Sequence, residues 1–166
     1  MIMFESCGYR LCTDIAEKKL QIINNISSIS LCSYDPFGPI TRAIMTELHI
    51  NQIGVVDDLK DNLCARESHI PCLHIISASE KYITTFVFQN GKEAGYQLIL
   101  HIQTNLFIPN KNCCPVNVRV HRFFIRNPCS ALFNDTQEND IRKDMYRDAA
   151  QQLIHQLFLR FEDCFS

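Results

Sequence analysis

The chain has 166 residues, a length that suits one domain able to bury about 70% of its unfolded surface without help from metals or disulfides. Its 16 basic and 18 acidic residues give a net charge of -2, so it lacks the general positive charge that binds nucleic acid. No apolar run approaches the ~20 residues that a membrane-spanning helix needs. We therefore expect neither a nucleic-acid partner nor a spanning segment.

The N-terminal part of the chain is polar and poorly periodic, with a small charge run at Glu17-Lys18-Lys19. We interpret residues 1–26 as an extended tether and residues 27–166 as a single domain. The first predicted strand is short and runs from Ile26 to Ser33.

A helix is predicted next, after the turn residues Asp35-Pro36-Phe37-Gly38-Pro39. Its apolar positions recur at helical spacing, which predicts one face packed on a sheet, and Gly54 can close it. These positions are Ile40, Ala43, Ile44 and Leu48. Residues 55–68 have no clear period.

Alternating apolar residues then predict a three-stranded antiparallel meander. The first part begins near Leu73 and continues to Phe88, as one long bent strand or as two, before the hairpin dipeptide Asn90-Gly91. From Tyr96 to Ile108 the even positions are mostly apolar, which indicates a half-buried strand. After Pro109-Asn110-Lys111-Asn112, the same even pattern resumes at Val116, Val118, Val120 and Phe124.

The last predicted element is a long amphipathic helix that follows Asn127-Pro128. Asp135 and Glu138 have the spacing of a capping box, which places the helix start near Asp135. We assign Arg142, Lys143, Arg147 and Asp148 to its solvent face. The opposite stripe recurs every four residues and indicates core packing: Ile141, Met145, Ala149, Leu153, Leu157 and Phe161.

Few residues suggest catalysis or metal binding. The common phosphate-loop, dinucleotide-binding, serine-hydrolase and zinc-protease motifs are absent, and the nine cysteines form no CxxC pair. Cys72 and His74 share a strand face and could form a thiol–imidazole pair. A turn centred between Lys111 and Asn112 would place His101 opposite His121, without further metal ligands on that face. We predict no catalytic site, metal or cofactor.

A set of short segments follows one order along the chain from Cys7 to Leu157. They are Cys7-Gly8-Tyr9-Arg10-Leu11, Asp35-Pro36-Phe37-Gly38-Pro39 with Arg42-Ala43, Phe88-Gln89-Asn90-Gly91, Tyr96, Ile108-Pro109, Arg122-Phe123-Phe124, Asn127-Pro128, Ala131-Leu132, Met145-Tyr146 and Ala149-Ala150-Gln151-Gln152-Leu153-Ile154. In this order the segments resemble a known family, the LPS-assembly lipoproteins LptE (also called RlpB).

This resemblance implies an α+β fold, a two-layer sandwich with two α-helices on one face of a mostly antiparallel four-stranded sheet. It also implies a non-catalytic partner of the outer-membrane barrel LptD, which plugs the barrel lumen, aids its assembly and binds lipopolysaccharide. The chain would be anchored in the outer membrane only by lipid on Cys7, on the periplasmic side. Basic side chains suit the phosphates of the glycolipid, and the candidates are Lys92, Lys111, Arg122 and Arg126.

Two alternatives remain from the residues alone. One is a soluble periplasmic module that binds a small ligand without a barrel partner. The other is a soluble enzyme that uses Cys72 and His74.

Overall fold

The computed structural model describes residues 26–57, 69–91, 93–126 and 129–165. In chain order, its elements are β1 (Ser28–Ser33), α2 (Pro39–Ile50), β2 (Gly54–Asp57), β3 (Cys72–Val87), β4 (Glu93–Phe107), β5 (Cys114–Ile125) and α3 (Ala131–Phe165). The candidate lipidation residue Cys7 and the candidate binding residue Lys92 lie outside the described residues, as does the predicted tether up to residue 25.

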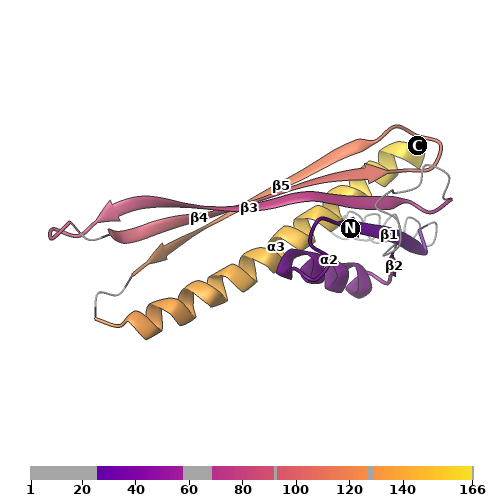
Figure 1. Ribbon diagram of the computed structural model, residues 1–166. Coiled ribbons are helices and arrows are strands. Elements are labelled where there is room, and N and C mark those ends of the chain that lie inside the picture. Colours follow the sequence, from indigo (N-terminus) through magenta and orange to yellow (C-terminus); the bar gives the residue numbers. More distant parts are fainter. Residues whose placement is uncertain (1–25, 58–68, 92, 127–128, 166) are drawn as a thin grey trace, which may run out of the picture.

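The strands form one open sheet, and both helices lie on the same side of it (Figure 1). The strand order is β2-β1-β3-β4-β5. Strand β1 pairs in parallel with β2 and β3, whereas β3, β4 and β5 are antiparallel neighbours. For the described residues, the predicted α+β class with two helices is thus confirmed. The prediction of a mostly antiparallel four-stranded sheet is wrong in detail, because the sheet has five strands and is mixed.

The additional strand is β2, which lies at the edge of the sheet beside β1. Only four residues form it, and they pair with β1 from Ser28↔Gly54 to Leu31↔Asp57. Such a segment is too short to show a sequence period, and in the sequence the whole of α2 separates it from its partner β1. Gly54 therefore begins a strand, donating its N–H to Ser27 O at 3.0 Å, and does not close the helix as predicted.

Helix α2 begins with Pro39 at its first turn, where the missing N–H of proline has no cost. Ile40, Ile44 and Leu48 are buried on the face that packs toward the sheet. The helix ends at Ile50, and Gln52 reverses the chain with a φ of 62°.

Strands β3, β4 and β5 form the predicted meander. β3 is one strand of 16 residues, interrupted by irregularities near Ile75 and Phe86. Its hairpin to β4 turns at Gly91, which has a φ of 77° that glycine adopts readily. Together β3 and β4 form a long ribbon that extends past α2 (Figure 1).

The β4–β5 turn is displaced from the predicted position. Asn110 has a φ of 63°, and Lys111 N donates to Ile108 O at 3.1 Å, so the turn lies earlier than expected. His101 consequently pairs with Arg119, and His121 pairs with Ile99. The predicted His101–His121 pairing is wrong by two residues, an even slip that leaves every side chain on its predicted face.

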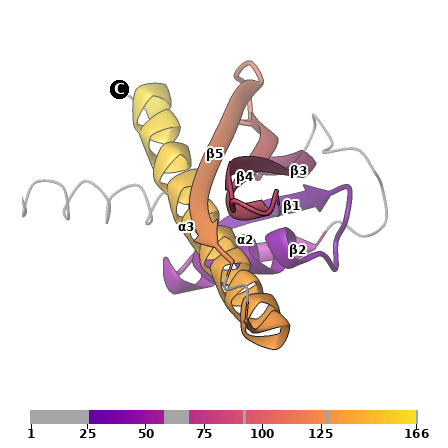
Figure 2. The ribbon, with the colours of Figure 1, turned by 90° about the vertical axis from the view of Figure 1, so that its left-hand side faces the viewer.

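Helix α3 has 35 residues and starts before the predicted position near Asp135. Ser130 acts as its N-cap, because Ser130 Oγ accepts a hydrogen bond from Phe133 N at 3.3 Å. The helix packs against β5 and β4 and crosses β5 at an oblique angle (Figure 2).

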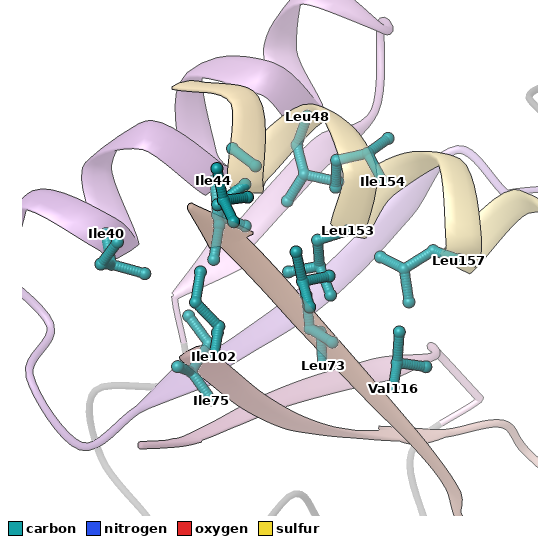
Figure 3. Close-up of a cluster of buried hydrophobic side chains, with 14 of the residues drawn as sticks. Ile40, Ile44, Leu48, Leu73, Ile75, Ile102, Val116, Leu153, Ile154 and Leu157 are labelled. Carbon is teal, nitrogen blue, oxygen red and sulfur yellow. The ribbon is translucent and has the colours of Figure 1, made fainter. Parts of the chain in front are cut away.

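The hydrophobic core lies between the helices and the inner face of the sheet (Figure 3). Ile44 and Leu48 of α2, Leu153 of α3 and Leu73 and Ile102 of the sheet are fully buried in it. The predicted even positions of β4 and β5 and the predicted stripe of α3 are confirmed as core, apart from Ile141, which packs against it while partly exposed. Full burial of one of these Leu, Ile, Val, Phe or Met side chains stabilises the fold by about 1.5–3 kcal/mol.

Candidate functional site

Arg122, one of the predicted glycolipid-binding residues, lies on the helix side of the sheet. It occupies an even position of β5 between Val120 and Phe124, and it pairs across the sheet with Leu98. Its guanidinium forms an ion pair with Asp148 of α3 and also donates to the backbone carbonyl of His121. A phosphate at this position would therefore have to compete with a carboxylate for the guanidinium.

Arg126 lies at the end of β5, close to the β3–β4 turn. Its guanidinium stands 4.8 Å from the centre of the Tyr96 ring, and its Nη2 is 3.9 Å from Glu138 Oε2. Its backbone N–H donates to Ala94 O, which fixes the end of the strand. The side chain is still 46% exposed, so it can contact an anion from solvent.

Lys111 is separated from the predicted arginines by most of the length of the sheet. It lies in the exposed β4–β5 turn, near the Leu106↔Cys114 pair, whereas Arg126 follows the Gly95↔Ile125 pair. The rise of a strand puts these two pairs roughly 35 Å apart. The structure therefore does not bring the described candidates together into one site.

A polar network that the sequence did not reveal joins the N-terminal half of α3 to β3. Arg142 is at its centre: Nε donates to Glu80 Oε2 at 3.1 Å, and Nη2 donates to Glu138 Oε1 at 2.9 Å and to the Tyr82 hydroxyl. Tyr82 donates to Glu138 at 2.9 Å, and Tyr146 donates to Glu80. These five residues replace apolar packing in this half of the helix–sheet interface.

Arg142 and Asp148 therefore face the sheet, and their assignment to the solvent face is wrong. The sequence does contain a sign of this contact: polar residues interrupt the apolar patterns of the strands that face α3. Glu80 and Tyr82 are on the core side of β3, opposite Leu100 and Leu98, and Arg122 interrupts the apolar positions of β5. Polar residues at core positions of two facing elements indicate a polar contact between them.

The network holds both tyrosines in their protonated form. Burial raises the pKa of Tyr146, and its hydrogen bond to the Glu80 carboxylate raises it further. Burial and the hydrogen bond to Glu138 likewise raise the pKa of Tyr82. For Arg142, burial acts to lower the pKa, but the Glu80 charge and the contacts with Tyr82 outweigh it and the pKa is raised. All three groups are thus kept in the protonation states that the hydrogen bonds need.

The face of the sheet that points away from the helices, here called the outer face, carries mostly polar residues on β3, β4 and β5. The register aligns their side chains in cross-strand rows. From the β4–β5 turn toward the β3–β4 turn, the rows are Ser77–Gln103–Asn117, Ser79–His101–Arg119, Lys81–Ile99–His121, Ile83–Gln97–Phe123 and Phe86–Gly95–Ile125. Within the described ranges, no group of histidine, cysteine or acidic residues could hold a metal ion.

Cys72 does not supply a free thiol, because it is disulfide-bonded and its side chain is buried. A disulfide sulfur cannot act as the thiolate nucleophile that the proposed pair with His74 requires. The structure therefore gives no support to the Cys72–His74 enzyme.

A small cleft opens where the β1–α2 connection meets β3, β4 and α3. Its volume is about 100 Å³, and Asp35, Glu80 and Tyr146 are among the side chains that line it. Pockets for small organic ligands usually measure ~300–1,000 Å³. The size of this cleft does not favour the small-ligand-binding alternative.

Comparison with known proteins finds bacterial lipoproteins that are similar in sequence and in fold. No family model matches the chain. The LPS-assembly lipoprotein LptE of Pectobacterium atrosepticum is 34% identical over 157 residues, which cover 95% of this chain and 79% of the relative. LptE of Yersinia pestis is 35% identical over 157 residues, covering 95% and 70%. The crystal structure of rare lipoprotein B from Shewanella oneidensis has the same fold, with a TM-score of 0.73 and 23% identity over 84% of this chain and 99% of that chain.

Proposed function

This chain belongs to the family of LPS-assembly lipoproteins LptE, and on that premise we propose that it takes part in assembling lipopolysaccharide at the outer membrane together with the β-barrel protein LptD. The observation that carries the proposal is the similarity to curated relatives along 95% of the chain. The role is one of structure and recognition, without a catalytic step.

We propose that the domain of residues 27–166 plugs the LptD lumen and aids the assembly of the barrel. The interior of a large outer-membrane barrel is polar. The open sheet fits such an interior, because its outer face presents amide, hydroxyl, imidazole and cationic side chains such as Gln103, Asn117, His101 and Arg119. The core between the sheet and the two helices supports this face from behind.

We propose that Lys92, Lys111, Arg122 and Arg126 contribute to contact with the glycolipid phosphates. Arg126 is the best placed of the described candidates, because it is exposed at the end of the sheet and its nearest carboxylate is 3.9 Å away. Arg122 contributes least, since Asp148 already occupies its guanidinium. Lys111 would act at the opposite end of the sheet.

Anchoring in the outer membrane by lipid on Cys7, which lies within the predicted tether of residues 1–26, completes the proposal. Within the part of the chain that the structure describes, no helix is both long and apolar enough to cross a membrane. Lipid on Cys7 would hold the domain on the periplasmic side, next to the barrel. The intact mass of the natively processed protein tests this: a mass increase from acyl chains on a chain beginning at Cys7 is expected, and an unmodified Cys7 would exclude the anchor.

The interaction with LptD is tested by co-expression. A tagged form of this chain and LptD from the same organism should co-purify from detergent-solubilised outer membranes as a complex that withstands gel filtration. Recovery of both proteins in separate fractions, each folded, would exclude the proposed partnership.

A further inference from the structure

The outer face bears a strip of basic side chains across the middle of β3, β4 and β5. Two neighbouring rows contribute to it, with His101 and Arg119 in one and Lys81 and His121 in the next. We call these four residues the cationic band, after the fixed charges of Lys81 and Arg119. Lys81, Arg119 and His121 are exposed, and both helices lie on the other side of the sheet (Figure 1).

The cationic band has no acidic partner among the described residues. The ion pairs of the described residues are made by other basic residues. Their acidic partners lie either on the helix side of the sheet or on the surface of α3. Glu80, between Ser79 and Lys81 in sequence, points to the helix side and contacts Arg142. The chain is negative overall, yet in the two rows of the band and in the row on either side of them the titratable side chains are all basic.

Charge complementarity makes the partner of this band anionic, and the layout of the band favours a broad surface over a single group. Lys81 on β3 and Arg119 on β5 are separated by β4 and lie in neighbouring rows, so two strand spacings and the rise of two residues put their backbones about 12 Å apart. Sites that hold one phosphate gather several donors around a point, often in a fork from one guanidinium. A surface with several carboxylates can pair with both charges at once.

The neighbouring rows also suit a protein surface. On one side lie the uncharged hydrogen-bonding residues Ser77, Gln103 and Asn117, and on the other side Ile83 and Phe123 are exposed. Interfaces between proteins combine such apolar residues with a polar rim.

We propose that the cationic band docks against a carboxylate-bearing patch on the inner wall of the partner barrel. This inference rests on the proposed function, and it names the face of the domain and the charge pattern that make the contact. Lys81 and Arg119 supply the fixed charges, while His101 and His121 add hydrogen bonds. The apolar residues Ile83 and Phe123 continue the same contact toward the β3–β4 turn.

The test is a double charge reversal, Lys81→Glu with Arg119→Glu, in the full chain. Its matched control is Lys143→Glu with Arg147→Glu, which changes the net charge equally at exposed positions of α3. Binding of each variant to purified LptD is measured between low and high salt. Thermal unfolding of all variants verifies that they are folded, and Lys81→Ala with Arg119→Ala provides a milder second pair.

We expect the reversal to weaken binding to LptD about tenfold or more at low salt, with a smaller difference at high salt, because exposed interfacial charges act mainly through screened attraction. The alanine pair should show a smaller loss in the same direction, and the α3 control should bind like the wild type. Wild-type affinity of both the reversal and the alanine pair would overturn the inference while leaving the proposed function intact.

Two further measurements distinguish LptD from other binding partners of the cationic band. If the reversal abolishes binding to vesicles containing lipopolysaccharide but leaves LptD binding unchanged, the band contacts glycolipid and the inference is wrong. If it instead converts a dimer of this chain into a monomer without affecting LptD binding, a second copy occupies the face and the inference is also wrong. Failure of the wild type itself to bind LptD would overturn both the proposed function and this inference.

Discussion

Arg142 Nε of α3 donates a hydrogen bond to Glu80 Oε2 of β3 at 3.1 Å, joining two residues that are 62 positions apart in the sequence. The contact belongs to a network that also includes Tyr82, Glu138 and Tyr146. It divides the helix–sheet interface into two halves of different chemistry. The C-terminal half of α3 packs apolar side chains against the sheet and α2, and the N-terminal half is held by charge and hydrogen bonds.

We predict that Arg142→Met lowers the free energy of unfolding by about 1–3 kcal/mol, because it removes hydrogen bonds to charged groups and leaves Glu80 and Glu138 without their common partner. Urea unfolding measures the change. Arg147→Met, at an exposed pair with Asp144, is the control and should change stability by less than about 0.5 kcal/mol. Equal effects of the two substitutions would contradict a structural role for the network.

Stability should fall at alkaline pH through the tyrosines of the same network. Folding raises the pKa of Tyr146 and of Tyr82, so their contribution is fully present below the ordinary pKa near 10.0. Above that value the unfolded chain releases the phenolic protons while the folded chain retains them, and stability decreases as pH rises. Unfolding midpoints in urea between pH 8 and pH 11 test the sign.

The matched variant for this pH dependence is Tyr146→Phe, which removes the titrating hydroxyl and keeps the ring. It should be less stable than the wild type at neutral pH because the hydrogen bond to Glu80 is lost. Its decline in stability above pH ~10 should be shallower. An unchanged slope would show that Tyr146 is not protonated preferentially in the folded state.

The apolar half of the interface should be the main source of stability. Leu153 is fully buried among the side chains of α2 and the sheet (Figure 3), so Leu153→Ala should cost about 2–5 kcal/mol in unfolding free energy. Leu159→Ala on the same helix, at a side chain that is 48% exposed, is the control and should cost much less. Comparable losses would mean that α3 is packed differently.

Binding of lipopolysaccharide tests the predicted basic residues. Replacing Lys92, Lys111, Arg122 and Arg126 together by alanine should weaken binding about tenfold at low salt, since each exposed charge contributes up to ~1 kcal/mol. Among the single variants, Arg126→Ala should have a larger effect than Arg122→Ala, because Asp148 holds Arg122. Surface plasmon resonance on immobilised glycolipid provides the measurement. Unchanged binding by the fourfold variant would exclude these residues from the contact.

Short-range patterns predicted most of the fold. Alternation along Tyr96 to Ile108 and along Val116 to Phe124 identified two strands and the sides that their residues occupy, and Asn90-Gly91 identified the hairpin. Strand β2 was missed because four residues show no period and its pairing with β1 is formed across a helix. The β4–β5 register was missed because it depends on the positive φ of a single residue, Asn110.

The polar contacts were harder to predict than the core. A charged residue on a helix is normally assigned to solvent, and only the facing element shows that Arg142 and Asp148 meet Glu80 and Arg122 instead. For the same reason, the sequence could nominate Arg122 and Arg126 as anion-binding residues but could not show that carboxylates of α3 already lie near them.

Co-purification with LptD tests the central claim most directly. Tagged chain and LptD, co-expressed and extracted from outer membranes in mild detergent, should elute as one complex that contains both proteins in equal amounts. If both proteins are folded and present but elute separately, this chain is not the partner of the barrel, and its proposed role in lipopolysaccharide assembly is contradicted.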